Sequence, residues 1–71
     1  MLTISQAILD TDEAIAALET RAAQLQDMAD YESGRYPATS AKYAAAGAEY
    51  TKAAYALKTA RQALSIFTLS R

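Results

Sequence analysis

The sequence predicts an all-α protein, an antiparallel two-helix hairpin with an alanine-rich coiled-coil seam. Three observations predict it. Alanine is the commonest residue, 18 of 71, and glycine and proline are scarce, which is a helix-forming composition. Apolar residues recur at steps of three and four across two long segments. Between these segments the run 32–37 interrupts the pattern, so a single domain over residues 1–71 folds back once.

The first helix is expected over residues 4–31. Thr3 followed by Gln6 has the spacing of a capping box, which places the helix start near residue 4. The steps of its seam alternate between four and three, which predicts one straight apolar edge that faces another helix. The seam residues are Ile4, Ile8, Thr11, Ile15, Leu18, Ala22, Leu25 and Ala29.

The turn is expected over residues 32–38. Gly34 can adopt the left-handed conformation that ends many helices, and Pro37 disfavours a helical conformation at Tyr36. A turn this short cannot span the length of a helix, so the second helix must return along the first.

The second helix is expected over about residues 39–69; Pro37 or the Thr39-Ser40 pair can start it, with Thr39 or Ser40 as a candidate N-cap. Its seam alternates large residues with alanine and closes on an aromatic side chain. A methyl group at every second seam position lets the facing helix approach closely, and Gly47 suits a place where two backbones meet. The expected seam is Tyr43, Ala46, Tyr50, Ala53, Leu57, Ala60, Leu64 and Phe67.

The tyrosines divide into two groups. Tyr36, Tyr43 and Tyr50 are seven residues apart and are expected to form the end of the core nearest the turn. Tyr55 falls off the seam and is expected on the outer face of the second helix. An exposed tyrosine among basic residues is typical of a protein-binding surface.

The charges support the hairpin. Residues 1–32 carry seven acids and one base, whereas residues 36–71 carry five bases and one acid. When residues whose numbers sum to about 70 face each other, opposite charges match. Exposed pairs contribute only about 0–1 kcal/mol each, so we interpret them as fixing register. The expected pairs are Asp10 with Arg61, Glu13 with Lys58, Glu19 with Lys52, Asp30 with Lys42, and Arg21 with Glu49.

A single hairpin of this size is expected to be marginally stable, because a small core rarely leaves more than about 3–5 kcal/mol of net stability. An apolar flank beside the seam offers a second hairpin a surface to cover. The sequence therefore predicts a homodimer that forms a four-helix bundle. The residues expected at its interface are Ala7, Ala14, Met28, Ala56 and Ala63.

Composition argues against catalysis and cofactors. The chain has no cysteine and no histidine, which removes the usual zinc ligands and nucleophile–base pairs. The carboxylate pairs Asp10/Glu13 and Asp27/Asp30 are interpreted as solvated helix acids, because di-iron sites in helical bundles also use histidine. No glycine-rich phosphate loop is present. We therefore expect no enzyme, no metal and no cofactor.

The charge balance and hydropathy limit the location and the partners. The net charge of −1 predicts no strong field for nucleic acid. Uncharged runs fall short of the roughly 20 apolar residues of a membrane span. The N-terminal residues lack the basic region and apolar stretch of a signal peptide, so a cytoplasmic location without membrane contact is expected.

The resulting hypothesis is a non-catalytic interaction module that binds another protein and inhibits or tethers it. Small chains without catalytic residues are typical of phage- or mobile-element-encoded modulators of host proteins, an analogy of class alone. The alternatives are a nucleic-acid-binding hairpin dimer and a coiled-coil component of a larger assembly. The candidate partner-binding residues are Lys52, Tyr55, Lys58, Arg61, Ile66 and Leu69.

Overall fold

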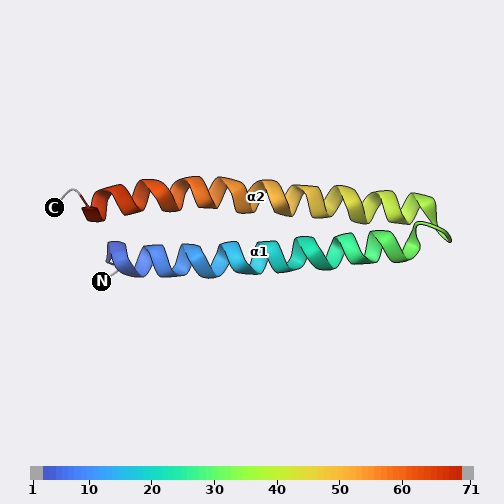
Figure 1. The fold of residues 1–71 in the computed structure, drawn as a ribbon, viewed down its shortest axis with the longest axis horizontal. Helices are drawn as coiled ribbons and strands as arrows, with labels where there is room; N and C mark the ends of the chain where they lie inside the picture. Colours follow the sequence, from blue (N-terminus) through green and yellow to red (C-terminus); the bar gives the residue numbers. More distant parts are fainter. Residues whose placement is uncertain (1–2, 70–71) are drawn as a thin grey trace.

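The computed structural model describes residues 3–69, with side chains described as far as Phe67. It contains two helices, α1 (Ile4–Glu32) and α2 (Pro37–Leu69), which lie side by side and run in opposite directions (Figure 1). The backbone measures 56 × 17 × 14 Å, so the molecule is a rod one helix thick and two helices wide. The start of α1 and the end of α2 lie together at the end opposite the turn, which we call the open end. The predicted antiparallel hairpin is confirmed.

The start of α1 follows the prediction in part. The backbone N–H of Gln6 donates to Thr3 Oγ1 at 3.0 Å, which satisfies one of the free amides of the first turn. The Gln6 side chain does not return to Thr3 as a full capping box requires; it donates to Asp10 Oδ1 at 2.9 Å. The helix thus begins at Ile4 with a threonine cap.

The seam of α1 is the predicted one. Ile15, Leu25 and Ala29 are buried, at 7%, 5% and 2% exposure. Ile4, at the open end, is 38% exposed, because little of α2 extends beyond it to cover it. The half-buried seam residues are Ile8, Thr11, Leu18 and Ala22.

The seam of α2 differs from the prediction at every second position from Ala53 onward, whereas Ala46 is half-buried. Ala53 and Ala60, which we expected to face α1, are exposed, and Phe67 is 62% exposed. The large residues Tyr43, Leu57 and Leu64 are half-buried as expected. The positions that face α1 between them are Ser40, Gly47, Ala54 and Arg61.

This shift has a steric cause. Residues three and four positions after a seam residue lie on opposite sides of it, and α2 has small residues on both sides. The helices approach through Gly47, where an added Cβ would lie 3.4 Å from Ala22 O and 3.5 Å from Leu25 Cβ. A glycine followed seven residues later by Ala54 therefore allows closer packing than the expected line of alanines.

The turn occupies residues 33–36 and does not use a left-handed glycine. Neither glycine has a positive φ, so the expectation for Gly34 is wrong. The last turn of α1 instead tightens through bonds between residues three apart: the Ser33 N–H donates to Asp30 O at 3.4 Å, and the Arg35 N–H donates to Glu32 O at 3.1 Å. α2 then begins at Pro37, where a missing N–H and a fixed φ suit the first helical position.

The tyrosines near the turn are more exposed than predicted. Tyr43 is half-buried, but Tyr50 is 37% and Tyr36 is 57% exposed. The ring of Tyr36 lies outside the seam, with the Arg35 guanidinium 5.8 Å from its centroid. The turn-proximal core is therefore built from Leu25, Ala29 and Gly47 instead.

Two ion pairs join the helices, and both fit the antiparallel register with partners other than those expected. Lys58 Nζ lies 2.7 Å from Glu19 Oε2, and Arg61 Nε lies 3.0 Å from Asp12 Oδ1. Lys52 pairs with Glu49 of its own helix at 3.2 Å. None of the five expected pairs forms within the described residues: Lys58 pairs with Glu19 in place of Glu13, and Arg61 pairs with Asp12 in place of Asp10.

Candidate functional site

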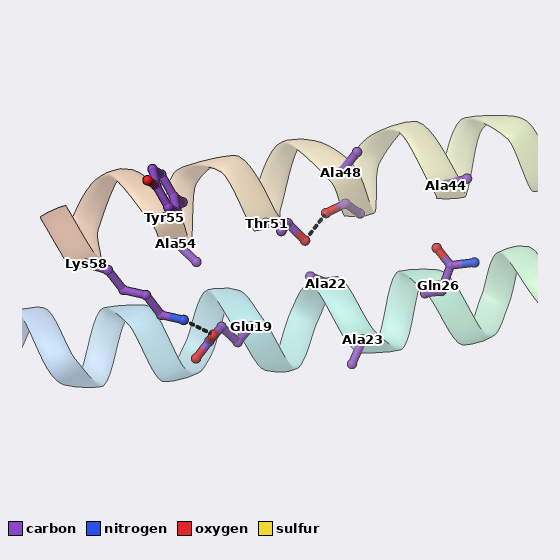
Figure 2. Close-up of a pocket in the computed structure, with 11 residues that line it drawn as sticks. Glu19, Ala22, Ala23, Gln26, Ala44, Ala48, Thr51, Ala54, Tyr55 and Lys58 are labelled. Atoms are coloured by element: carbon purple, nitrogen blue, oxygen red, sulfur yellow. Dashed lines mark hydrogen bonds and ion pairs between the residues drawn. The ribbon is translucent and has the colours of Figure 1, made fainter.

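The seam divides the surface of the hairpin into two broad faces. We call one the groove face, because a shallow groove of about 480 Å³ runs between the helices there (Figure 2). Its floor consists of the small seam residues Ala22, Gly47 and Ala54 with Ala23 and Ala48 beside them. The groove exists because none of these side chains extends beyond a methyl group, so the space between the two backbones is left unfilled.

Four of the polar side chains that line the walls of the groove have a partner within the chain: Glu19, Gln26, Thr51 and Lys58. Lys58 reaches across from α2 to Glu19 of α1, as Figure 2 shows, and both side chains are about half exposed. The Thr51 hydroxyl donates to Gly47 O at 3.1 Å. Gln26 Nε2 donates to Asp30 Oδ1 at 3.0 Å. The groove therefore offers an apolar floor between satisfied polar edges.

The structure brings together only some of the candidate partner-binding residues. Tyr55 and Lys58 both line the groove, and Tyr55 is 73% exposed on the outer side of α2 (Figure 2). Arg61 lies one turn further, paired with Asp12. Lys52 is exposed and bonded to Glu49, away from the groove.

The remaining candidates lie at the open end. Ile66 is 66% exposed there. The side chain of Leu69 lies outside the described residues. Ile66 is therefore separated along α2 from the groove, and the candidates do not form one continuous patch.

The groove was not predicted from the sequence. Its signal is the set of small residues at Ala22, Gly47 and Ala54, which lie in the seams of the two helices. That signal becomes readable only when the true seam of α2 is known. When Ala53 is assigned to the seam in place of Ala54, the small residues of α2 are placed on the wrong side of the helix.

The opposite side of the hairpin, which we call the apolar face, contains three of the expected dimer residues, Ala7, Ala14 and Met28. Ala14 and Met28 are exposed and Ala7 is half-buried. Ala56 and Ala63 are exposed, and on α2 they lie further from the seam than the positions next to it. Heptad spacing from the seam places three more residues of α2 beside them on this side. The apolar face is Ala7, Ala14, Met28, Ala46, Ala53 and Ala60.

The two faces differ in charge. Two ion pairs bridge the described parts of the helices, Glu19 with Lys58 and Asp12 with Arg61. Arg61 belongs to the seam, and the other three residues lie one step beyond it on the groove side. The corresponding positions of the apolar face are alanines and Met28, apart from Arg21, Thr39 and Phe67. The hairpin thus has one face that ion pairs bridge and one on which the positions next to the seam carry a single charge, Arg21.

Among the residues described, no three acidic side chains gather closely enough to hold a metal ion. No buried side-chain nitrogen or oxygen in this part of the chain lacks a hydrogen bond. Neither helix, over its described length, contains a segment apolar enough to cross a membrane.

Comparison of the chain with protein-family models, with curated proteins and with solved structures finds no match.

Proposed function

We propose that the hairpin is a cytoplasmic, non-catalytic interaction module that dimerises into a four-helix bundle and binds another protein, which it inhibits or tethers. The exposure of its apolar side chains carries this proposal. In the described residues only Ile15, Leu25, Ala29 and Ala54 are buried hydrophobics, whereas nine large hydrophobic or aromatic residues are exposed. Such an excess of exposed apolar surface is typical of chains that work in contact with other proteins.

The accessible area points the same way. The chain exposes 5281 Å². A compact monomer of 7.6 kDa exposes about 4,300 Å² by the scaling of area with mass. The difference, about 1,000 Å², is close to the roughly 800 Å² that each partner buries in a standard protein–protein interface. The free hairpin therefore has spare surface equivalent to about one interface.

The pairing of the basic residues supports a protein partner over nucleic acid. Lys52, Lys58 and Arg61 each lie within 3.2 Å of a carboxylate oxygen in the chain. A base that already neutralises a carboxylate releases few counterions when it meets a phosphate, so it contributes little to nucleic-acid affinity. Tyr55 and Lys58 beside an apolar groove suit a protein surface better.

Sedimentation equilibrium at micromolar concentration tests the dimer. We expect a species of twice the 7.6 kDa of the chain. A single monomeric species contradicts dimerisation.

Affinity capture from a lysate of the source cells tests partner binding. A partner of the groove face should be retained by the tagged chain and lost on Tyr55→Ala combined with Lys58→Ala. Thr20→Ala, at an exposed site of α1 that does not line the groove, is the control and should retain it. Equal capture by all three proteins contradicts binding through this face.

A further inference from the structure

Heptad spacing places four charged residues on the side of the hairpin that carries the apolar face, namely Asp10, Arg21, Lys42 and Glu49. Two of them stand out. Arg21 is the only base in α1, and Glu49 is the only acid in α2. Arg21 is seven residues from both Ala14 and Met28, and Glu49 is seven residues before Ala56, so helical periodicity places both on this side. Both are exposed.

Arg21 and Glu49 also lie at the same level along the rod. Ser40 Oγ donates to Ala29 O at 2.6 Å, and a Cβ on Gly47 would touch Ala22 O, so residues whose numbers sum to about 70 are level with each other.

Despite this, the two residues do not pair with each other. Arg21 Nη1 donates to Gln24 Oε1 at 3.3 Å, and Glu49 pairs with Lys52 at 3.2 Å. Each charge is thus held by a weak exposed contact within its own helix, which costs little to exchange.

Building on the proposed dimer, we infer that a second copy of this chain packs on the apolar face with both turns at the same end of the bundle. A two-fold axis parallel to the rod relates the copies in that arrangement. It keeps every residue at its own level and lays α1 of one copy over α2 of the other. Arg21 of each copy then meets Glu49 of the other, and the contact forms twice.

The other symmetric arrangement has the two-fold axis across the rod and the turns at opposite ends. It lays α1 over α1, and α1 has seven acids and one base. Arg21 of one copy would then face α1 of the other copy and Glu49 would face α2, so Arg21 and Glu49 could not meet, and the two acid-rich helices would lie against each other. Charge complementarity therefore selects the arrangement with the turns together.

The apolar face suits a second hairpin in size as well as charge. Five of its six residues are alanines, which let two helix layers approach closely, and Met28 can adapt to the facing surface. Tyr50 and Ile4, at 37% and 38% exposure, are seam residues whose heptad position lies toward this side. A second copy would cover their exposed edges. The spare area of about 1,000 Å² estimated above is enough for a standard interface.

Charge reversal tests the contact. We expect Arg21→Glu or Glu49→Arg alone to raise the dimer dissociation constant by about tenfold or more, and the double variant to restore most of the loss. Sedimentation equilibrium gives the constants, and circular dichroism checks that each variant stays helical. Glu19→Lys and Lys58→Glu break an ion pair on the groove face and serve as matched controls that should leave the constant unchanged.

A distance measurement tests the orientation independently. The chain has no native cysteine, so Gly34→Cys allows one spin label per turn. Turns at the same end place the two labels much closer together than the 56 Å length of the rod, whereas turns at opposite ends separate them by about that length.

A dimer with widely separated labels, or one that the reversals leave unchanged, overturns this inference while leaving the proposed dimer standing. A monomer at all concentrations overturns both.

Discussion

Gly47 is buried, and it is where a side chain would first collide with the other helix. The nearest atoms to an added Cβ belong to Ala22, Leu25 and Gln26 of α1, at 3.4, 3.5 and 3.8 Å. Its φ is not positive, so glycine is not required there by backbone conformation. Contact distance alone decides which residues the position accepts, and a single methyl group is the largest that fits without displacement.

Substitutions at Gly47 should therefore change stability in opposite directions. Gly47→Ala should raise the free energy of unfolding by up to about 1 kcal/mol, because alanine has the higher helix propensity and its methyl fits. Gly47→Leu should lower it by about 1–3 kcal/mol, because the larger side chain forces the helices apart. Urea unfolding at one fixed protein concentration measures both.

The turn supplies a control for Gly47. Nothing lies within 4 Å of a Cβ added to Gly34, so Gly34→Ala should be neutral or slightly stabilising. If Gly47→Leu proves as stable as Gly47→Ala, the close approach of the helices at this residue is wrong.

At the scale of the elements, Ser40 ties the start of α2 to the end of α1. Its hydroxyl, half-buried, donates to Ala29 O at 2.6 Å. Ala29 is 2% exposed, so its carbonyl group has little access to water. A helix end buried without a partner would be costly, and this bond removes that cost while setting the register of the hairpin.

Removing the Ser40 hydroxyl should destabilise the hairpin more than removing a similar group nearby. We expect Ser40→Ala to lower the free energy of unfolding by about 1–2 kcal/mol, since it leaves a buried acceptor unsatisfied. Ser33→Ala is the comparison, because Ser33 Oγ donates to Asp30 O at an exposed site and water can replace it. Thermal unfolding of the two variants at equal concentration measures the difference. Equal losses would contradict a special role for Ser40.

The sequence predicted the buried side of α1 better than that of α2. The reason is the difference in polarity between the seam residues and their neighbours, which is large in α1 and small in α2. In α1 the apolar seam is bordered by charged residues such as Asp12, Glu19 and Arg21, so only one line of residues suits burial. In α2 alanine occurs on nearly every side, including Ala46, Ala53 and Ala54. Periodicity of apolar residues then marks a helix without marking its buried side, and packing at Gly47 makes the choice.

The turn and the site were predicted less well for related reasons. The expectation for Gly34 relied on the commonest way to end a helix, whereas backbone hydrogen bonds of Ser33 and Arg35 tighten the end of α1. The exposure of Tyr55 followed from its place off the seam. The groove beside it depends on which small residues face α1, and that information is not local in the sequence.

At the scale of the whole molecule, packing is uneven along the rod. The buried residues lie between Ile15 and Ala29 in α1 and at Gly47 and Ala54 in α2. At the open end Ile66 is 66% exposed. Contacts there also join residues far apart in the chain, as between Arg61 and Asp12, so closing them costs more chain entropy than closing contacts beside the turn.

Amide hydrogen exchange should reveal this gradient. We expect the slowest exchange over residues 22–29 and 43–54, and exchange at least about tenfold faster over residues 5–10 and 60–67, because local opening needs least free energy where few apolar contacts are broken. Mass spectrometry of proteolytic peptides, or nuclear magnetic resonance, measures the rates. Uniform protection along both helices would contradict an open end that frays first.

No described side chain is buried beyond 98% of its surface, and this thin interior has a consequence for heat capacity. Unfolding an ordinary protein of 71 residues raises the heat capacity by about 0.9–1.1 kcal/mol/K, mostly through hydration of newly exposed apolar groups. A lone hairpin hides fewer such groups, so its increment is smaller and its stability changes more gently with temperature. Cooling should therefore lower the stability of a lone hairpin only slightly, and its thermal unfolding transition should be broad. A second copy would hide more apolar surface, so the loss of stability on cooling would be larger and the transition sharper.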